Sequence, residues 1–174
     1  MMLRKILIQS LAIFGLTSAA MANDFYFGVS AVDTEYDEVG LSIDNNGHAV
    51  TFGMNLDMLS GVNTALEVSY GDLLDTSISG VAVSAETLDI SILASFGSGN
   101  IRPFGRLGFS DGEVKASAGG ASASADDTTE IWGLGADFIV SDTSFIRLEM
   151  TDAEYEDVVD AEVETIRLGV FTRF

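Results

Sequence analysis

The chain has 174 residues, carries 27 acidic against 8 basic side chains for a formal net charge of −19, and contains no cysteine. This charge disfavours nucleic acid as a partner, because nucleic-acid binding needs a basic surface. The lack of cysteine excludes a disulfide framework, a thiolate metal site and a thiol nucleophile. The mean hydropathy is nevertheless +0.31, which conflicts with an ordinary soluble acidic protein.

The first residues predict a secretory signal peptide. Two basic residues precede an apolar run from Ile6 to Leu16, and small residues follow up to an A-x-A cleavage site at 20–22. The run is shorter than the roughly 20 residues of a membrane-spanning helix, which disfavours an uncleaved anchor. We therefore expect residues 1–22 to be a cleaved signal peptide and residues 23–174 to form one domain.

The remainder of the chain alternates apolar and polar residues with the period of two that is typical of β-strands. Each segment places apolar side chains on one face, as Val50 and Phe52 show, and polar residues or glycine on the other. Pro103 predicts the start of a strand or a bulge. Most segments are close to the roughly 9–11 residues that a tilted strand needs to cross a bilayer. In chain order the eight segments are 24–32, 49–57, 64–72, 87–97, 101–109, 131–140, 144–152 and 165–174.

The connections between these segments alternate in length. Those at 58–62, 97–100 and 141–144 are short, and longer polar loops are expected at 33–47, 72–84, 110–128 and 152–161. Outer-membrane barrels have short periplasmic turns and longer extracellular loops. We therefore predict an all-β fold, a transmembrane up-and-down antiparallel β-barrel of about eight strands with both termini on the periplasmic side. The serine-rich stretch Ala116–Asp127 is expected to be a flexible outer loop.

These features resemble a known family, the small eight-stranded outer-membrane β-barrels of Gram-negative bacteria, which include the transmembrane domain of outer-membrane protein A and the opacity-type surface proteins. The signal peptide, the eight alternating strands, the stretch Arg102–Phe109 and the terminal Phe174 carry the resemblance. It implies location in the cell outer membrane, in contact with lipid and lipopolysaccharide. It also implies an assembly signature that the barrel-assembly machinery reads during insertion, here Ile166, Leu168, Val170 and Phe174.

Charged residues recur on the polar face of the predicted strands. The interior of an eight-stranded barrel is just wide enough for side chains to fill it, and an unpaired buried charge costs several kcal/mol, on the order of 3–5 when a pair is broken. We therefore expect ion pairs that close the lumen, although a gated proton or ion path through a narrow porin-like channel stays open as an alternative. The candidates are Glu67, Asp89, Arg106, Asp137, Arg147, Glu149 and Arg167.

An enzymatic function finds little support in the sequence. Some small outer-membrane barrels modify lipids, and such chemistry would need a histidine with a nearby serine and carboxylate. His48 is the only histidine, and neighbours such as Ser42 and Asp44 are as readily explained as loop residues. We therefore predict that the protein is not an enzyme, and we assign no catalytic residue and no cofactor.

Acidic residues crowd the predicted outer loops, as at Asp33–Glu38, Asp126–Asp127 and Asp152–Asp160. Closely spaced carboxylates can hold Ca²⁺ or Mg²⁺, but none of these loops has the ordered spacing of an EF-hand, so no metal ligand is assigned. Weak binding of divalent cations that bridge to lipopolysaccharide phosphates is the minority interpretation. A solvated surface is favoured.

The sequence thus predicts an integral outer-membrane β-barrel protein with a structural or surface-interaction role, such as envelope integrity or attachment. The alternatives are a narrow porin-like channel, a lipid-modifying enzyme, and a soluble periplasmic barrel that binds a ligand. The soluble barrel would require the apolar face to point inward and the charged face to point to water.

Overall fold

The structure is a computed structural model that describes residues 25–38, 41–59, 62–78, 80–155 and 161–174. The predicted signal peptide lies outside these residues. Within them, no helix is both long and apolar enough to cross a membrane.

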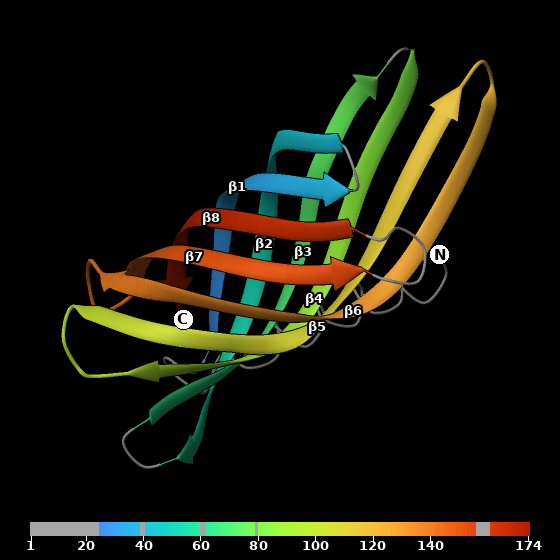
Figure 1. Cartoon of the computed structure of the whole chain (residues 1–174). Coiled ribbons are helices and arrows are strands. Elements are labelled where there is room, and N and C mark those ends of the chain that lie inside the picture. Colours follow the sequence, from blue (N-terminus) through green and yellow to red (C-terminus); the bar gives the residue numbers. More distant parts are fainter. Residues whose placement is uncertain (1–24, 39–40, 60–61, 79, 156–160) are drawn as a thin grey trace.

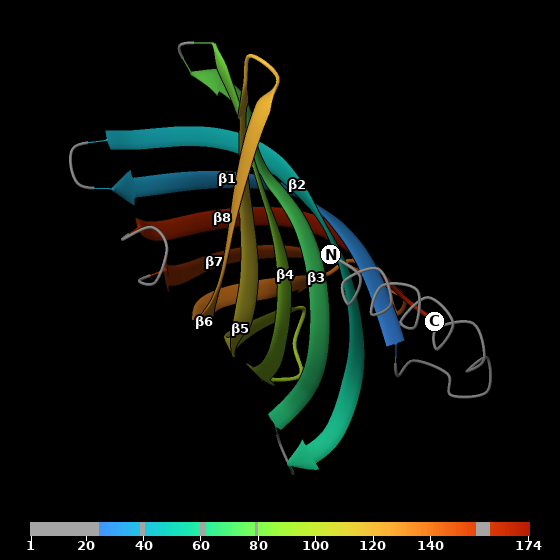
Figure 2. The same cartoon turned by 90° about the vertical axis from the view of Figure 1, so that its right-hand side faces the viewer.

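Eight antiparallel strands form a closed barrel in which each strand pairs with its neighbour in sequence and β1 pairs with β8 (Figures 1 and 2). This arrangement confirms the predicted all-β, up-and-down antiparallel barrel. The strands are β1 Phe25–Glu38, β2 Leu41–Leu59, β3 Val62–Ile78, β4 Val81–Phe96, β5 Ile101–Ala118, β6 Ala121–Ile139, β7 Ser144–Tyr155 and β8 Ala161–Arg173.

Apolar side chains form a belt around the outside of the barrel. Leu107 is 71% exposed and Val170 is 61% exposed, although both are large and apolar. Intervening residues such as Arg106 and Gly169 are buried. The alternation therefore has the phase that the sequence predicts, with the apolar face outward. The alternative of a soluble barrel with an apolar interior is wrong for this chain.

The first and last described residues meet at the end of the barrel that carries the short turns. The Phe174 amide donates a hydrogen bond of 3.0 Å to the Phe25 carbonyl, and the Arg173 amide donates one of 2.7 Å to Thr143 in the β6–β7 turn. The Phe25 ring stacks on Phe52 and Phe174 with centroid separations of 5.8 and 6.4 Å. Aromatic residues at this level are typical of the membrane interface, and short turns are typical of the periplasmic side.

The prediction of long polar outer loops at 33–47, 72–84 and 110–128 is wrong, because the strands continue through most of these residues. Ala118 pairs with Ala121 across Gly119 and Gly120, whose φ angles are +57° and +87°. Glycine adopts positive φ without steric cost, so these two residues form a tight hairpin turn. The serine-rich stretch 116–127 therefore lies mostly in paired strands. At 152–161, β7 continues to Tyr155 and β8 begins at Ala161.

Two hairpins reach farther than the others. In Figure 1 the tips of β3–β4 (green) and β5–β6 (yellow to orange) project beyond the ends of β1, β7 and β8. The four outer half-strands remain paired with one another, through Ala82–Ser117 between β4 and β5 and Ser117–Ser122 between β5 and β6. They form an outer sheet, which we define as residues 74–78, 80–86, 112–120 and 121–128.

Two register shifts interrupt the ladders, one between Leu56 and Leu59 and one between Asp72 and Leu74. Pro103, expected at a strand start or bulge, is the third residue of β5 and pairs in regular register with Ala136. It lies on the outer face, near the start of the strand.

A charge placed on the belt tests which face meets lipid. Leu148 lies between Ile146 and Met150 on the outer face of β7. Leu148→Arg should lower the free energy of unfolding by about 2–4 kcal/mol if it faces the middle of the bilayer. The control Thr128→Arg adds the same side chain to an exposed position of the outer sheet and should cost much less. Urea unfolding in lipid vesicles measures the free energy of unfolding of both variants. Equal losses would contradict the assignment of the apolar belt to the lipid-facing side.

Candidate functional site

Glu67 of β3 is the centre of a network in the barrel interior, and its relative exposure is 0%. Its carboxylate accepts hydrogen bonds from the Tyr26 hydroxyl and from the guanidinium groups of Arg106 and Arg147. The Arg106 Nη2 to Glu67 Oε2 distance is 2.5 Å. One carboxylate therefore connects β1, β5 and β7 across the lumen.

Each of these two arginines binds a second carboxylate. Arg106 contacts both carboxylate oxygens of Glu149, through Nε to Oε1 and through Nη2 to Oε2 at 3.1 Å. Arg147 contacts both oxygens of Asp137, at 2.7 and 3.0 Å. Such bidentate, charge-assisted pairs are stronger and more directional than neutral hydrogen bonds. The five charged groups form one continuous network.

A second pair lies nearer the outer end of the barrel. Arg167 Nη2 lies 2.8 Å from Asp89 Oδ2, and the Ser110 hydroxyl donates a 2.7 Å hydrogen bond to Asp89 Oδ1. Ser110 also contacts the Tyr155 hydroxyl at 2.9 Å. Tyr155 lies beyond Met150, the last apolar residue of β7 on the belt, and burial raises its pKa to about 12. Its hydroxyl is therefore protonated at neutral pH.

Four aromatic rings surround the Arg147 guanidinium, at the end of the central network nearest the short turns. The Arg147 guanidinium carbon lies 4.5 Å from the Phe104 ring centroid, 4.8 Å from Phe171, 5.5 Å from Phe145 and 5.9 Å from Tyr26. Phe145 and Phe171 stack at 4.9 Å. Cations are attracted to aromatic faces, more strongly where water is excluded. The rings form an apolar layer across the lumen, next to the ion pairs.

Small residues give these rings their space. An added Cβ on Gly28 would overlap the Phe171 ring, and one on Gly53 would overlap Tyr26. Packing of the neighbouring rings therefore explains why β1 and β2 carry glycine at these two positions. Only residues without a side chain fit the inner face where a neighbouring ring crosses it.

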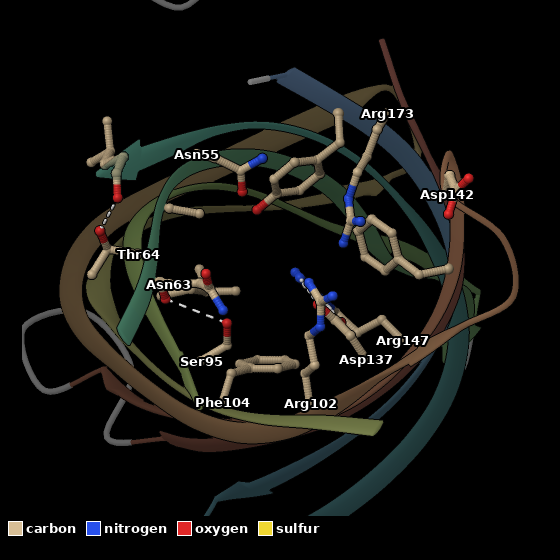
Figure 3. A pocket seen from close by; sticks show the side chains of 15 residues that line it. Asn55, Asn63, Thr64, Ser95, Arg102, Phe104, Asp137, Asp142, Arg147 and Arg173 are labelled. Carbon is tan, nitrogen blue, oxygen red and sulfur yellow. Dashed lines mark hydrogen bonds and ion pairs between the residues drawn. The ribbon is translucent and has the colours of Figure 1, made fainter. Parts of the chain in front are cut away.

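The mouth of the barrel below the rings holds a cavity of about 330 Å³. Figure 3 shows Arg102 and Arg173 extending into it, with Asn55, Asn63 and Ser95 on the other side. All eight strands contribute to its lining, from Tyr26 of β1 to Arg173 of β8.

The structure places all seven lumen candidates in the interior and gives each at least one oppositely charged partner: Glu67, Asp89, Arg106, Asp137, Arg147, Glu149 and Arg167. Sequence reasoning missed the Tyr26 hydroxyl and the rings of Phe145 and Phe171. The sequence does carry a signal for their inward orientation, because all three alternate with the outward apolar residues of their strands.

The other candidates are not brought together into a site. His48 is exposed on β2, and the side chains of Ser42 and Asp44 are outside the described part of the chain. Ile166, Leu168, Val170 and Phe174 all point outward and are 51–61% exposed; their reading by the assembly machinery stays a prediction. Asp152 lies close to Glu162 and Glu164, with carboxylate oxygens within 4.8 Å of one another.

An eight-stranded barrel with an apolar belt outside and paired charges inside defines an integral membrane barrel. The model of the outer membrane protein beta-barrel domain family matches residues 8–174. The chain therefore belongs to that family and is an outer-membrane protein. No curated protein matches the sequence.

Several solved structures share the fold. The attachment invasion locus protein Ail of Yersinia pestis is 17% identical, with a TM-score of 0.69, over 88% of this chain and 100% of Ail. Neisserial surface protein A is 12% identical, with a TM-score of 0.72, over 88% and 99%. The N-terminal β-barrel domain of Pseudomonas aeruginosa OprF is 15% identical, with a TM-score of 0.60, over 88% and 100%.

Breaking the central network should be costly. Arg106→Met leaves the Glu149 carboxylate and part of Glu67 without a cationic partner, and should lower the free energy of unfolding by about 3–5 kcal/mol. Lys115→Met is the control, because Lys115 is 46% exposed and lies 3.3 Å from Glu113 and 3.6 Å from Glu86. An exposed pair contributes less than about 1 kcal/mol. Similar losses for the two variants, measured by urea unfolding in lipid vesicles, would show that the network is not buried as described.

Proposed function

We propose that this protein is a closed, non-catalytic outer-membrane barrel that presents its outer sheet for attachment to another macromolecule. The observation that carries the proposal is the extension of β3–β6 beyond the belt as a paired sheet. A barrel that served only to span the membrane would not need these extra residues, because about 9–11 residues cross a bilayer, whereas β6 has 19.

The outer sheet has edges that support strand pairing with a partner. The register between β2 and β3 ends at the His48–Asp72 pair, so residues 74–78 of β3 extend past it. On the other side, the register between β6 and β7 ends at Ile131–Ala153, and the Thr129 hydroxyl still donates to the Glu154 carbonyl beyond it. Among the described residues, no strand pairs with residues 121–128 of β6 on this side. An open strand edge presents unpaired N–H and C=O groups and is a template for an added strand.

The charge of the outer sheet selects among partners. Asp75, Asp126 and Glu130 are exposed on it or at its base, whereas Lys115 is already held by Glu86 and Glu113. One structure of Ail is a complex with the heparin analogue sucrose octasulfate. A sulfated polyanion suits this chain poorly, because like charges repel. We infer a basic or neutral protein surface as the partner.

The interior argues against the rival channel. The ion pairs connect strands on different sides of the lumen, and the aromatic rings pack against Arg147 beside them. A continuous water column would have to displace both. We therefore infer that the lumen residues close the barrel and hold its strands in register.

Export, membrane insertion and lipid contact are inferred from the family and from the outer surface of the barrel. We infer cleavage after residue 22, insertion by the barrel-assembly machinery through the outward row that ends at Phe174, and contact with lipid and lipopolysaccharide around the belt. Weak divalent-cation bridging at acidic residues such as Asp152 stays a minor part of the proposal.

Planar-bilayer recording tests the closed lumen. The unmodified protein should give no steady single-channel current, because ion pairs and rings fill the interior. A wide porin reconstituted in the same bilayers is the control for insertion. Steady, reproducible currents from this protein would instead favour the porin-like channel.

Shortening one hairpin tests the outer sheet. Asp111 and Thr128 face each other in register, so replacing residues 112–127 with Asn-Gly should close the hairpin with a two-residue turn. Cells displaying this variant should lose most of their adhesion to immobilised basic proteins. The variant should still change its gel mobility on boiling, which shows that its barrel is folded. Gly99→Ala, in open space at the opposite end, is the control and should change nothing.

Two results would contradict the proposal. One is full adhesion by the shortened variant, which would place the contact elsewhere. The other is stronger adhesion to immobilised heparin than to basic proteins at about 0.15 M salt, where charges more than about 8 Å apart are largely screened.

A further inference from the structure

Two arginines at the periplasmic mouth differ from those deeper in the lumen. Within the described residues, neither Arg102 nor Arg173 forms an ion pair, whereas Arg106, Arg147 and Arg167 each bind a carboxylate. Arg102 Nε makes one long hydrogen bond, 3.4 Å to the Gly99 carbonyl. The Arg173 guanidinium lies 4.9 Å from the Phe145 ring centroid. Both side chains therefore have donors to spare.

The two guanidinium groups also act on each other. They extend into the same cavity from β5 and β8 (Figure 3). Burial and the charge of Arg102 disfavour the charged form of Arg173, and the Asp137 carboxylate offsets part of this effect. Such a pair is unusual in a chain with 27 acidic and 8 basic residues, because a carboxylate could easily have been placed between them. An anion from outside the chain would relieve the repulsion.

The cavity has the form of a small-molecule site. Its volume of about 330 Å³ falls at the lower end of the roughly 300–1,000 Å³ range of ligand pockets. On the lumen side the cavity ends at the rings of Tyr26, Phe104 and Phe145 and at the Arg147–Asp137 pair. Asn63 and Ser95 offer polar groups across from Arg102 and Arg173 (Figure 3). Guanidinium groups bind carboxylates and phosphates through two parallel hydrogen bonds.

The acidic residues of the mouth limit what can enter. Asp137 lines the cavity but is engaged by Arg147 through both oxygens. Asp142, in the β6–β7 turn, lies on the rim. A carboxylate at the rim disfavours large polyanions, which would have to pass it, more than a small anion bound between the two guanidinium groups.

We propose that the periplasmic mouth binds a small oxyanion, a carboxylate or a phosphate, between Arg102 and Arg173. Two sources share this chemistry, free phosphate and the C-terminal carboxylate of a short peptide. This site is independent of the proposed attachment function, because it lies at the opposite end of the barrel from the outer sheet.

Titration of the full-length barrel in zwitterionic detergent micelles tests the site. The probes are inorganic phosphate, a dipeptide with a free C-terminal carboxylate, and the amide of that dipeptide. In NMR spectra of the unmodified protein, the Nε–H signals of Arg102 and Arg173 should shift on saturation with an anion. Those of Arg106 and Arg167, which do not line the cavity, should stay in place. The dipeptide amide should cause no shift. Whichever of the two anions binds more tightly, phosphate or the dipeptide carboxylate, identifies the source of the ligand.

Matched variants give the second measurement. Arg102→Gln and Arg173→Gln should each weaken anion binding about tenfold or more, because each removes a charged hydrogen-bond donor. Lys115→Gln makes the same charge change on the outer sheet and should leave binding unchanged. Equal shifts at all five arginines, no saturable shift with either anion, or unchanged binding by Arg102→Gln and Arg173→Gln would overturn the proposal.

Discussion

The constraint on which this structure depends is that hydrocarbon offers no hydrogen-bond partner to the backbone. Strands can cross a membrane only if every N–H and C=O is paired within the protein, which requires a closed barrel. The pairing of β1 with β8, from Tyr26–Arg173 to Glu38–Ala161, provides that closure. Because lipid solvates the outer face, polar residues gather inside, and because eight strands enclose little space, these residues must pack against one another.

Charged side chains in so small an interior need almost complete pairing with opposite charges and hydrogen-bond partners. The lumen brings three arginines, Arg106, Arg147 and Arg167, against four carboxylates. Hydroxyl groups supply the additional donors, Tyr26 at Glu67 and Ser110 at Asp89. Compensation is less complete at the outer pair, where Arg167 Nε has no hydrogen-bond partner among the residues that the structure describes. The central network therefore holds the barrel more firmly than the outer pair does.

The alternation of residues predicts the faces of the strands but not their length or their partners. Val50 and Arg147 lie where a period of two places them, because lipid and lumen impose opposite demands on neighbouring residues. The sequence predicts loops for the outer halves, because Ala, Ser and Asp in 116–127 do not alternate with large apolar residues once the strand has left the membrane. The contact of Glu67 with Arg147, 80 residues apart in sequence, depends on strand tilt and closure, which a pattern within one strand does not encode.

The central claim is that apolar residues face lipid while the charged face is sealed inside. The chain has no cysteine, so a single introduced thiol reports on one position. Leu168, 56% exposed on the belt, and Ser69, 1% exposed in the lumen, give the sharpest contrast. In lipid vesicles, Leu168→Cys should react with a lipid-soluble maleimide and resist a water-soluble one. Ser69→Cys should resist both until the barrel unfolds. Rapid reaction of both thiols with the water-soluble reagent in the folded protein would contradict the account.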